Sequence, residues 1–354
     1  MAAQIDMSKL EKFVGGVVGD LGASGHAALV VIGDKLGLYK AMAEGGALTP
    51  ADLAKRTGTN ERYIREWLNA QAASGYALYD AKAGTFSLTP EQGFALATEV
   101  GPASVAGAFQ VIQAMWQNLP KMMDNFKTGD GLEWGKQHPC LFEGTERFFR
   151  SGYIANLVGS WIPALDGVKE KLEKGARVAD VGCGLGASTL ILAQAFPNSK
   201  FFGFDYHQGS IDMARERAKQ AGVAERVTFD VAKATDFPGK GYDMVAFFDC
   251  LHDLEDPTGA AKHARETLAA DGTLMVVEPY AGDRAEQNHN PVGRLYYSAS
   301  TMLCVPHSLS HKGPALGAQA GEARLRAVIV EGSGFKTLRR AAETPFNMVL
   351  EARP

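Results

Sequence analysis

The chain has 354 residues, 46% hydrophobic and 21% charged, with a formal net charge of −4. This length predicts two or more domains with a substantial core. The charge balance excludes the strongly basic surface that binding to nucleic acid or acidic lipid needs. Four widely spaced cysteines argue against a disulfide framework and favour a reducing, cytoplasmic location. The start carries no signal-peptide pattern, and no apolar run approaches the roughly 20 residues that span a bilayer.

Residues 1–96 are predicted to form a helical domain that ends in a winged helix. Thr49 followed by Pro50 is typical of a helix start, and apolar residues recur at helical spacing after the turn TGTN. The segment YALYDAKAGTFSLTP then predicts two short strands. A winged helix can bind DNA or mediate dimerisation. Between residues 27 and 91, seven Lys and Arg are balanced by seven Asp and Glu, which favours dimerisation.

Residues 97–172 are predicted to be a helical linker rich in aromatic side chains. Aromatic rings bury much area at low entropic cost, so they serve as core packing between domains or as the walls of a ligand pocket. Both roles stay open at this point. If the linker contributes to a pocket, we expect Trp134, Phe142 and Tyr153 to contact the substrate.

Strand and helix patterns alternate from residue 173 to residue 354. The predicted strands are RVADVG, KFFGFD, RVTFDVA, YDMVAFFDC, GTLMVVEP, FKTLRRA and FNMVLEAR. Helical patterns separate the first five, which predicts an α/β fold with a doubly wound, mostly parallel, seven-stranded sheet. Only AETP joins the last two strands, which is too short for a crossover helix, so the last strand is predicted to be antiparallel.

The turn after the first of these strands contains Gly182, Gly184 and Gly186. Glycine allows a ligand to approach the backbone closely, and the following helix offers free N–H groups. The turn also matches a GxGxxA dinucleotide pattern, which alone is weak evidence for NAD. Asp180 would repel a pyrophosphate but attract a cationic amino-acid group, which favours a different nucleotide. Cys183 is expected to fill the turn rather than to act as a nucleophile.

These residues resemble the first motif of the class I S-adenosylmethionine-dependent methyltransferases. The resemblance extends to Asp205, which in that family accepts both ribose hydroxyls, and to Tyr206, which would flank the adenine. It implies S-adenosyl-L-methionine as the cofactor. A winged helix ahead of the catalytic domain is similar to the small-molecule O-methyltransferases of plants and actinobacteria and to a bacterial subgroup of winged-helix methyltransferases. This likeness implies a homodimer.

The segment DCLHDLEDP is similar to the segment in which those enzymes carry a histidine as general base. The resemblance assigns this role to His252, with Asp253 or Glu278 orienting the imidazole. An ordinary imidazole pKa of about 6.5 suits proton removal near neutrality. Family position also places Phe248 and Asp249 beside the methionine part of the cofactor. The alternatives are a capping role for His252 and plain core packing for Phe248.

The chain departs from the family pattern in two places. Leu254 stands where the family usually has Trp, and Lys233 stands near the acidic residue that contacts the adenine. The candidates for the adenine contact are therefore Lys233, Ala234 and Asp236, or a backbone group.

An insertion at about residues 280–322 is predicted to form a lid over the methyl acceptor. Within it, Tyr296 and Tyr297 are the expected contacts to the acceptor. The lid also contains a cysteine and two histidines, but their spacing matches no zinc pattern, so no metal is expected.

The predicted activity is methyl transfer to the oxygen or sulfur of a small molecule by in-line displacement, with His252 as the general base. Two alternatives are a ligand-sensing, DNA-binding regulator and an NAD-linked oxidoreductase. Neither nucleic acid nor a membrane is an expected partner.

Overall fold

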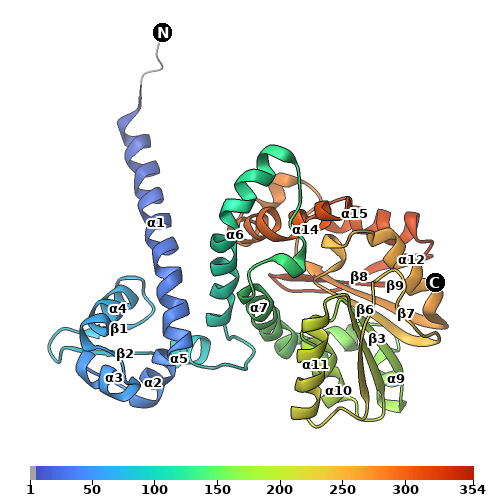
Figure 1. Cartoon of the computed structure of the whole chain (residues 1–354), viewed down its shortest axis with the longest axis horizontal. Helices are drawn as coiled ribbons and strands as arrows, with labels where there is room; N and C mark the ends of the chain where they lie inside the picture. The colour runs from blue at the N-terminus through green and yellow to red at the C-terminus, as the bar shows by residue number, and fades with distance from the viewer. Residues whose placement is uncertain (1–4) are drawn as a thin grey trace. The chain divides into compact units, whose positions relative to one another are not determined.

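The computed structural model describes residues 5–354, which form two compact units divided after Gln113 (Figure 1). The first unit is mainly helical. Its elements are α1 (Met7–Lys35), α2 (Leu38–Gly45), α3 (Pro50–Thr57), α4 (Glu61–Ala73), β1 (Leu78–Asp80), β2 (Thr85–Ser87) and α5 (Pro90–Leu96). The division falls within α6 (Phe109–Thr128).

Helices α3 and α4 and the β1–β2 hairpin form the predicted winged helix. Thr49 caps α3: its hydroxyl accepts a hydrogen bond from the Asp52 amide, the Asp52 carboxylate accepts one from the Thr49 amide, and Pro50 occupies the first turn. Trp67 of α4 is buried and donates its indole N–H to the carbonyl of Leu29 at 2.8 Å. The unit therefore has a core of its own.

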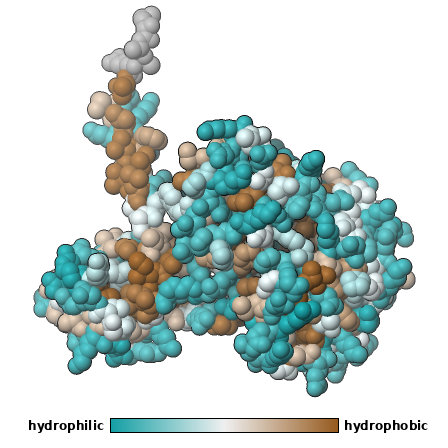
Figure 2. All heavy atoms as spheres, in the orientation of Figure 1, coloured by the Kyte–Doolittle hydropathy of each residue, from teal (hydrophilic) through white to brown (hydrophobic). Residues whose placement is uncertain are grey.

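Helix α1 lies within the predicted helical domain and is a single helix of 29 residues. It contains six glycines, which lower its helix propensity and interrupt its apolar residues. Among residues 5–354 it is the one helix long and apolar enough to cross a membrane, a criterion that core helices and signal sequences also meet. The expectation that no such segment exists is therefore wrong for α1. Its exposed apolar residues (Figure 2) are Met7, Leu10, Phe13, Val14, Val17, Val18, Leu21 and Ile32.

The second unit contains the seven-stranded sheet. Its further helices are α7 (Cys140–Asn156), α8 (Ile162–Ala164), α9 (Val168–Lys174), α10 (Ala187–Ala195), α11 (Gln208–Gln220), α12 (Pro257–Thr267), α13 (Pro291–Ala299), α14 (Val305–Ser310) and α15 (Gly321–Arg326). Its strands are β3 (Arg177–Val181), β4 (Lys200–Asp205), β5 (Val227–Val231), β6 (Tyr242–Phe248), β7 (Leu268–Pro279), β8 (Thr337–Glu343) and β9 (Asn347–Arg353). Three π-helical turns continue α7, α13 and α15: Leu157–Trp161, Ser300–Cys304 and Ala327–Gly332.

The strand order is β5-β4-β3-β6-β7-β9-β8, and β9 runs antiparallel to both of its neighbours. The predicted sheet with its antiparallel last strand is confirmed. Strand β3 pairs with β4 on one side and with β6 on the other, so the strand order reverses at β3. This reversal of strand order creates a crevice at the carboxyl ends of the strands, where ligands of such sheets bind.

Helices cover both faces of the sheet, and alternate strand residues point to opposite faces. Val178 of β3 packs in the cluster that includes α9, α10 and α11, whereas Ala179 and Val181 pack in the cluster that includes α12 and α15. Because both faces are buried, the strands read as apolar runs in the sequence. The strands that end at the crevice are therefore packed between helices on both faces of the sheet.

Candidate active site

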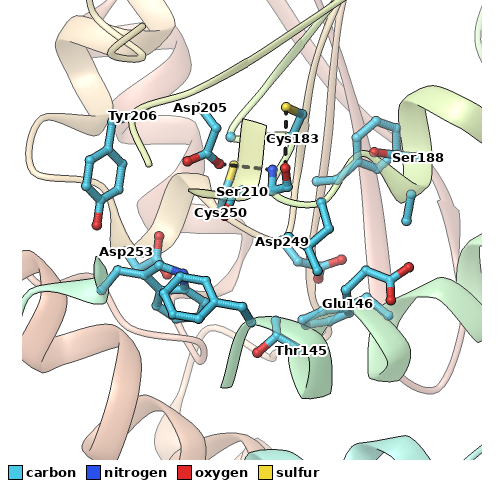
Figure 3. A pocket seen from close by; sticks show the side chains of 18 of the residues that line it. Thr145, Glu146, Cys183, Ser188, Asp205, Tyr206, Ser210, Asp249, Cys250 and Asp253 are labelled. Atoms are coloured by element: carbon cyan, nitrogen blue, oxygen red, sulfur yellow. Dashed lines mark hydrogen bonds between the residues drawn. The ribbon is translucent and has the colours of Figure 1, made fainter. Parts of the chain in front are cut away.

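A cavity of about 1010 Å³, its open mouth included, lies at the carboxyl ends of β3, β4 and β6 (Figure 3). Its walls come from the turn after β3, the loops after β4, β5 and β6, and helices α7 and α14. The cavity therefore occupies the crevice that the reversal of strand order predicts.

The turn after β3 brings bare backbone to this cavity. Gly182, Gly184 and Gly186 have φ values of 74°, 53° and 83°, which disfavour other residues. A Cβ on Gly184 would meet no atom within 4 Å, so the space beside it is open to a ligand. A Cβ on Gly186 would lie 2.8 Å from the Phe229 ring, so this glycine permits packing instead. Gly182 and Gly184 line the cavity, whereas Gly186 lies behind it.

Asp180 is buried behind the turn. The hydroxyls of Ser188 and Thr189 donate to its Oδ2 atom at 2.6 and 2.5 Å, which anchors the start of α10. Within residues 5–354 its Oδ1 atom is buried without a hydrogen-bond partner. Burial raises the pKa of Asp180 to about 6, although the two hydroxyl hydrogen bonds oppose the shift. A cation bound at the turn would compensate this acceptor.

Asp205 ends β4, and backbone amides fix both of its carboxylate oxygens. Gly184 donates to Oδ2 and His207 donates to Oδ1, each at 2.9 Å. Burial raises the pKa of Asp205, and the two amides oppose the shift. Each oxygen can accept a further hydrogen bond, so the carboxylate suits a vicinal diol. Beside it, the rings of Tyr206 and His307 stack with their centroids 5.8 Å apart, and both line the cavity.

His307 of α14 is a wall residue that the sequence analysis did not assign to the site. The amide of Trp134, which also lines the cavity, donates to Nδ1 of His307 at 3.1 Å. Burial lowers the pKa of His307 to about 4, so the ring is neutral at pH 7. The predicted Tyr296 instead donates its hydroxyl to the Phe346 carbonyl at 2.8 Å, and neither it nor Tyr297 lines the cavity.

Helix α7 supplies an aromatic wall. Phe142, Thr145, Glu146, Phe149 and Tyr153 recur at helical spacing and all line the cavity. Phe142 and Tyr153 were predicted to contact the substrate, whereas Thr145, Glu146 and Phe149 were not. The same spacing would have identified them, since residues three or four apart share a helix face.

Asp249 follows β6 with a φ of 53°, a left-handed conformation that is rare outside glycine. The Tyr153 hydroxyl donates to its Oδ2 atom and the Asn347 amide donates to its Oδ1 atom, both at 2.7 Å. Burial raises the pKa of Asp249 well above its usual value. The carboxylate thus ties α7 and β9 to the end of β6, while Phe248 and Asp249 both line the cavity.

His252 and Asp253 lie on a short 3-10 turn after β6. An oxygen of Glu278 lies 2.5 Å from Nδ1 of His252, and the Cys304 sulfur lies 3.3 Å from Nε2. Burial opposes the imidazolium, but Glu278 and Cys304 outweigh burial and raise the pKa of His252 well above its usual value. Burial also raises the pKa of Asp253 to about 7. Glu278, rather than Asp253, therefore contacts Nδ1 of the imidazole, while Asp253 alone of these four lines the cavity.

The remaining predicted cofactor residues divide into two groups. Ala234 and Cys183 line the cavity. Lys233 forms an ion pair with Glu255 at 2.9 Å, and its backbone N–H donates to Asp236, so neither Lys233 nor Asp236 faces the main cavity. Of the three candidates for the adenine contact, only Ala234 lies on the cavity wall.

Comparison with known families identifies the class of this protein. Residues 172–321 match the family model described as "Methyltransferase domain", and residues 24–98 match the "Rv2258c-like winged HTH domain". The chain therefore combines a methyltransferase domain with an N-terminal winged helix, an organisation similar to that of the class I S-adenosylmethionine-dependent methyltransferases. S-adenosylmethionine is the cofactor of this class.

Individual relatives agree with the class. The chain is 28% identical over 151 residues to erythromycin 3''-O-methyltransferase of Saccharopolyspora erythraea, which is 38% of this chain and 49% of that protein. The fold matches mitomycin 7-O-methyltransferase MmcR at a TM-score of 0.72 and 18% identity, covering 99% of this chain and 100% of that one. The fold also matches human N-acetylserotonin methyltransferase with bound SAM at a TM-score of 0.70 and 14% identity. This match covers 100% of this chain and 99% of that one. The chain spans half or less of the length of the curated relatives it matches.

The residues present fit this cofactor. The fixed Asp205 carboxylate suits the ribose diol, and the open space beside Gly184 admits the chain that joins the ribose to the amino acid. Asp180 does not itself line the cavity, but its buried Oδ1 atom has no hydrogen-bond partner within residues 5–354, and a nearby cation would lower the cost of a buried charge there.

Proposed function

We propose that this protein transfers a methyl group to a hydroxyl oxygen of a small acceptor with a large apolar or aromatic surface. The observation that carries the proposal is the aromatic wall of α7, which lines the same cavity as the glycine turn. Two of the compared proteins are named O-methyltransferases, which supports oxygen as the acceptor atom.

The raised pKa of His252 favours the imidazolium, so in this proposal Nε2 first releases its own proton and then accepts the proton of the acceptor hydroxyl. Glu278 holds Nδ1 and thereby fixes the ring and the tautomer. When bound, S-adenosylmethionine supplies an electrophilic methyl group on a sulfonium. Asp205 and the glycine turn fix one reactant and α7 positions the other, and such alignment can contribute about 7–11 kcal/mol to lowering a barrier. Cys304 covers Nε2, so the turn Ser300–Cys304 has to shift before an acceptor reaches the base.

The direct test is transfer of labelled methyl from S-adenosylmethionine to a panel of phenols, catechols, thiols and sulfide. We expect transfer to a hydroxyl, with His252→Ala lowering kcat by about 10²–10⁴-fold and leaving S-adenosylhomocysteine binding unchanged. His263→Gln is the matched control, because Nε2 of His263 faces the Phe237 carbonyl at 2.8 Å, away from the cavity. Transfer to sulfur alone would contradict the oxygen assignment. Full turnover in His252→Ala would contradict the base.

Titration of the protein with S-adenosylhomocysteine and with NAD distinguishes the proposed methyltransferase from an NAD-linked oxidoreductase. The buried carboxylate of Asp180 behind the glycine turn disfavours a pyrophosphate at that turn. We expect S-adenosylhomocysteine to bind and NAD to show no binding. Binding of NAD alone would contradict the proposed cofactor chemistry.

A DNA-binding role has little support in the winged helix. On α4, Arg62 pairs with Glu66 at 2.5 Å and Arg65 pairs with Glu61 at 2.6 Å. These arginines already have carboxylate neighbours, which would repel phosphates. We propose that the domain does not read DNA. Tight, salt-sensitive duplex binding by the full chain would overturn this.

We propose instead that the first unit mediates a homodimer through α1. Five exposed apolar residues of α1 follow a heptad-like spacing: Met7, Leu10, Val14, Val17 and Leu21. Such a stripe is typical of a helix that packs against another helix. Light scattering should show a dimer for the wild type and a monomer for Leu21→Glu, whereas Leu36→Glu, at an exposed residue beyond the stripe, should stay dimeric. Binding of the wild type to lipid vesicles, with no dimer in solution, would favour a membrane instead.

We propose a cytoplasmic location. All four cysteines are free thiols in the structure, and free thiols persist in a reducing compartment. Fractionation of cells should place the protein in the cytosolic fraction, and recovery in the membrane fraction would overturn the assignment.

A further inference from the structure

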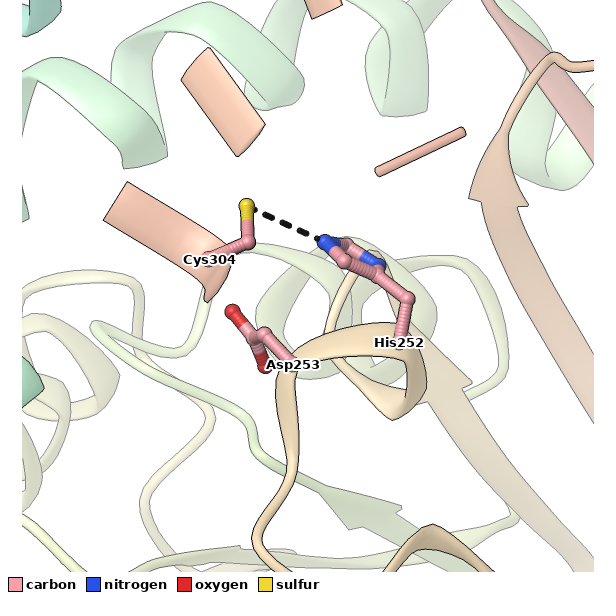
Figure 4. Close-up of side chains that lie close together, drawn as sticks. All are labelled: His252, Asp253 and Cys304. Atoms are coloured by element: carbon pink, nitrogen blue, oxygen red, sulfur yellow. Dashed lines mark hydrogen bonds between the residues drawn. The ribbon is translucent and has the colours of Figure 1, made fainter. Parts of the chain in front are cut away.

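Three side chains with metal-binding atoms meet beside the cavity (Figure 4). A ring nitrogen of His252, a carboxylate oxygen of Asp253 and the sulfur of Cys304 all lie within 4.8 Å of one another. The cofactor site described above does not use Cys304. Its role is therefore open.

Two short helical turns bring these residues together. His252 and Asp253 belong to the 3-10 turn after β6, and Cys304 ends the π-helical turn between α13 and α14. A π-helical turn inserts an extra residue into a helix and often marks a functional site. Although Cys304 is 52 positions from His252 in the sequence, its sulfur lies 3.3 Å from Nε2.

The donor set and its spacing suit a tetrahedral ion. Zinc sites that keep an open position have three protein ligands drawn from thiolate, imidazole and carboxylate, at about 2.3 Å for sulfur and 2.0–2.1 Å for nitrogen. Those bond lengths require sulfur and nitrogen to be about 3.5 Å apart in a tetrahedron. The distance between the Cys304 sulfur and Nε2 of His252 is 3.3 Å, so little movement is needed.

The surroundings of the cluster also suit an ion. Metal-binding histidines usually present their other nitrogen to a carboxylate, and Glu278 lies 2.5 Å from Nδ1 of His252. Asp253 is only 9% exposed, and within residues 5–354 no other side chain donates a hydrogen bond to its carboxylate. Because Asp253 lines the cavity, the cavity gives an ion a path to the cluster.

We propose that His252, Asp253 and Cys304 bind a thiophilic divalent cation of the Zn²⁺ type, and that binding switches off proton removal at the active site. The ion would bind the same Nε2 lone pair that accepts the proton of the acceptor. On binding, the Cys304 thiol and Nε2 of the His252 imidazolium each release a proton to solvent as the metal–sulfur and metal–nitrogen bonds form, and no group is oxidised or reduced. The inhibitory half of this inference rests on the proposed role of His252, whereas the binding half does not.

Titration of the full-length protein with Co²⁺ tests binding without methyl donor or acceptor. We expect about one equivalent to bind with a thiolate-to-cobalt charge-transfer band, and Zn²⁺ to displace it. Cys304→Ala should abolish the band and weaken binding by more than about 100-fold, beyond the effect typical of losing an outer-shell partner. Cys140→Ala is the matched control: its sulfur lies 2.9 Å from Nδ1 of His138, and no third ligand joins that pair in the described chain.

Activity gives the second readout. Zn²⁺ at one equivalent should inhibit methyl transfer by the wild type and by Cys140→Ala, a chelator should restore it, and Cys304→Ala should resist inhibition. If Cys304→Ala does not fold, Asp253→Asn takes its place as the test of metal binding, with the cobalt band as its only readout. Absence of the band in the wild type, or a band that persists in Cys304→Ala, would overturn the proposal. Cobalt binding without inhibition would overturn only the inhibitory half.

Discussion

Replacing Asp180 with Asn should make the protein less sensitive to pH. The oxygen of an Asn can still accept from Ser188 and Thr189, but the side chain cannot ionise. The pKa of Asp180 is about 6 in the folded protein, whereas an unperturbed Asp side chain, as in the unfolded chain, has a pKa of 3.8. Because the folded value is the higher one, this group's contribution to stability is fully present below pH 3.8 and is lost as pH rises through 6. The whole loss corresponds to about 3 kcal/mol.

Urea unfolding of the wild type and of Asp180→Asn, measured at pH 5 and at pH 8, tests this magnitude. Between these values the wild type should lose about 1.4 kcal/mol of unfolding free energy that the variant retains. Comparing two pH values cancels the constant cost of burying the new amide N–H. Parallel pH dependences, or a smaller loss in the wild type than in the variant, would refute the reasoning.

Ligand binding by the same variant tests the assignment of the ammonium group. At pH 8 the ionised Oδ1 atom of Asp180 should attract the ammonium of S-adenosylhomocysteine, so Asp180→Asn should bind it more weakly in calorimetry. Below pH 6 the two affinities should converge, because wild-type Asp180 becomes protonated. Equal affinities at pH 8 would refute the ammonium assignment and leave the stability argument intact.

Three further substitutions address the rest of the site. Asp205→Ala removes a charged acceptor for two hydroxyls, worth about 1.5–3 kcal/mol each, so calorimetry should show S-adenosylhomocysteine binding weakened by about 100-fold or more; unchanged affinity would exclude Asp205 as the diol acceptor. Gly186→Ala places a Cβ 2.8 Å from Phe229 at a positive φ, so urea unfolding should show a loss of about 1–3 kcal/mol; a wild-type midpoint would contradict the packing role. Tyr153→Phe removes one of two side-chain donors to the buried Asp249 carboxylate, and the expected loss of stability is again about 1–3 kcal/mol; wild-type stability would show that the carboxylate finds another donor.

The sheet and the nucleotide turn were predictable because their signals are local. Gly184 stands next to its strand, and Asp205 ends the following one, so the strand pattern alone places both at one edge of the sheet. Parallel pairing then brings together residues that are 21 positions apart. The antiparallel last strand followed from the length of one short connection.

The acceptor side was less predictable because tertiary packing decides it. Tyr296 and His307 lie in the same insertion, and nothing in their local sequence shows that the first faces Phe346 and the second faces the cavity. Cys304 reaches His252 only through a π-helical turn, which has no clear sequence signature. On α7, by contrast, the helical spacing of Phe142 and Tyr153 would also have predicted Thr145, Glu146 and Phe149 as wall residues.

The order of the strands also bears on how the molecule is synthesised. Strand β9 follows the other six in the chain, yet it lies between β7 and β8. As the chain emerges from a ribosome, β7 therefore presents an unpaired edge until β9 appears, and unpaired edges invite pairing with other chains. Asn347 of β9 holds the Asp249 carboxylate at the cavity wall. A nascent chain that ends after β8 would thus contain every residue that lines the cavity and still lack the Asn347 contact that holds Asp249 in its wall.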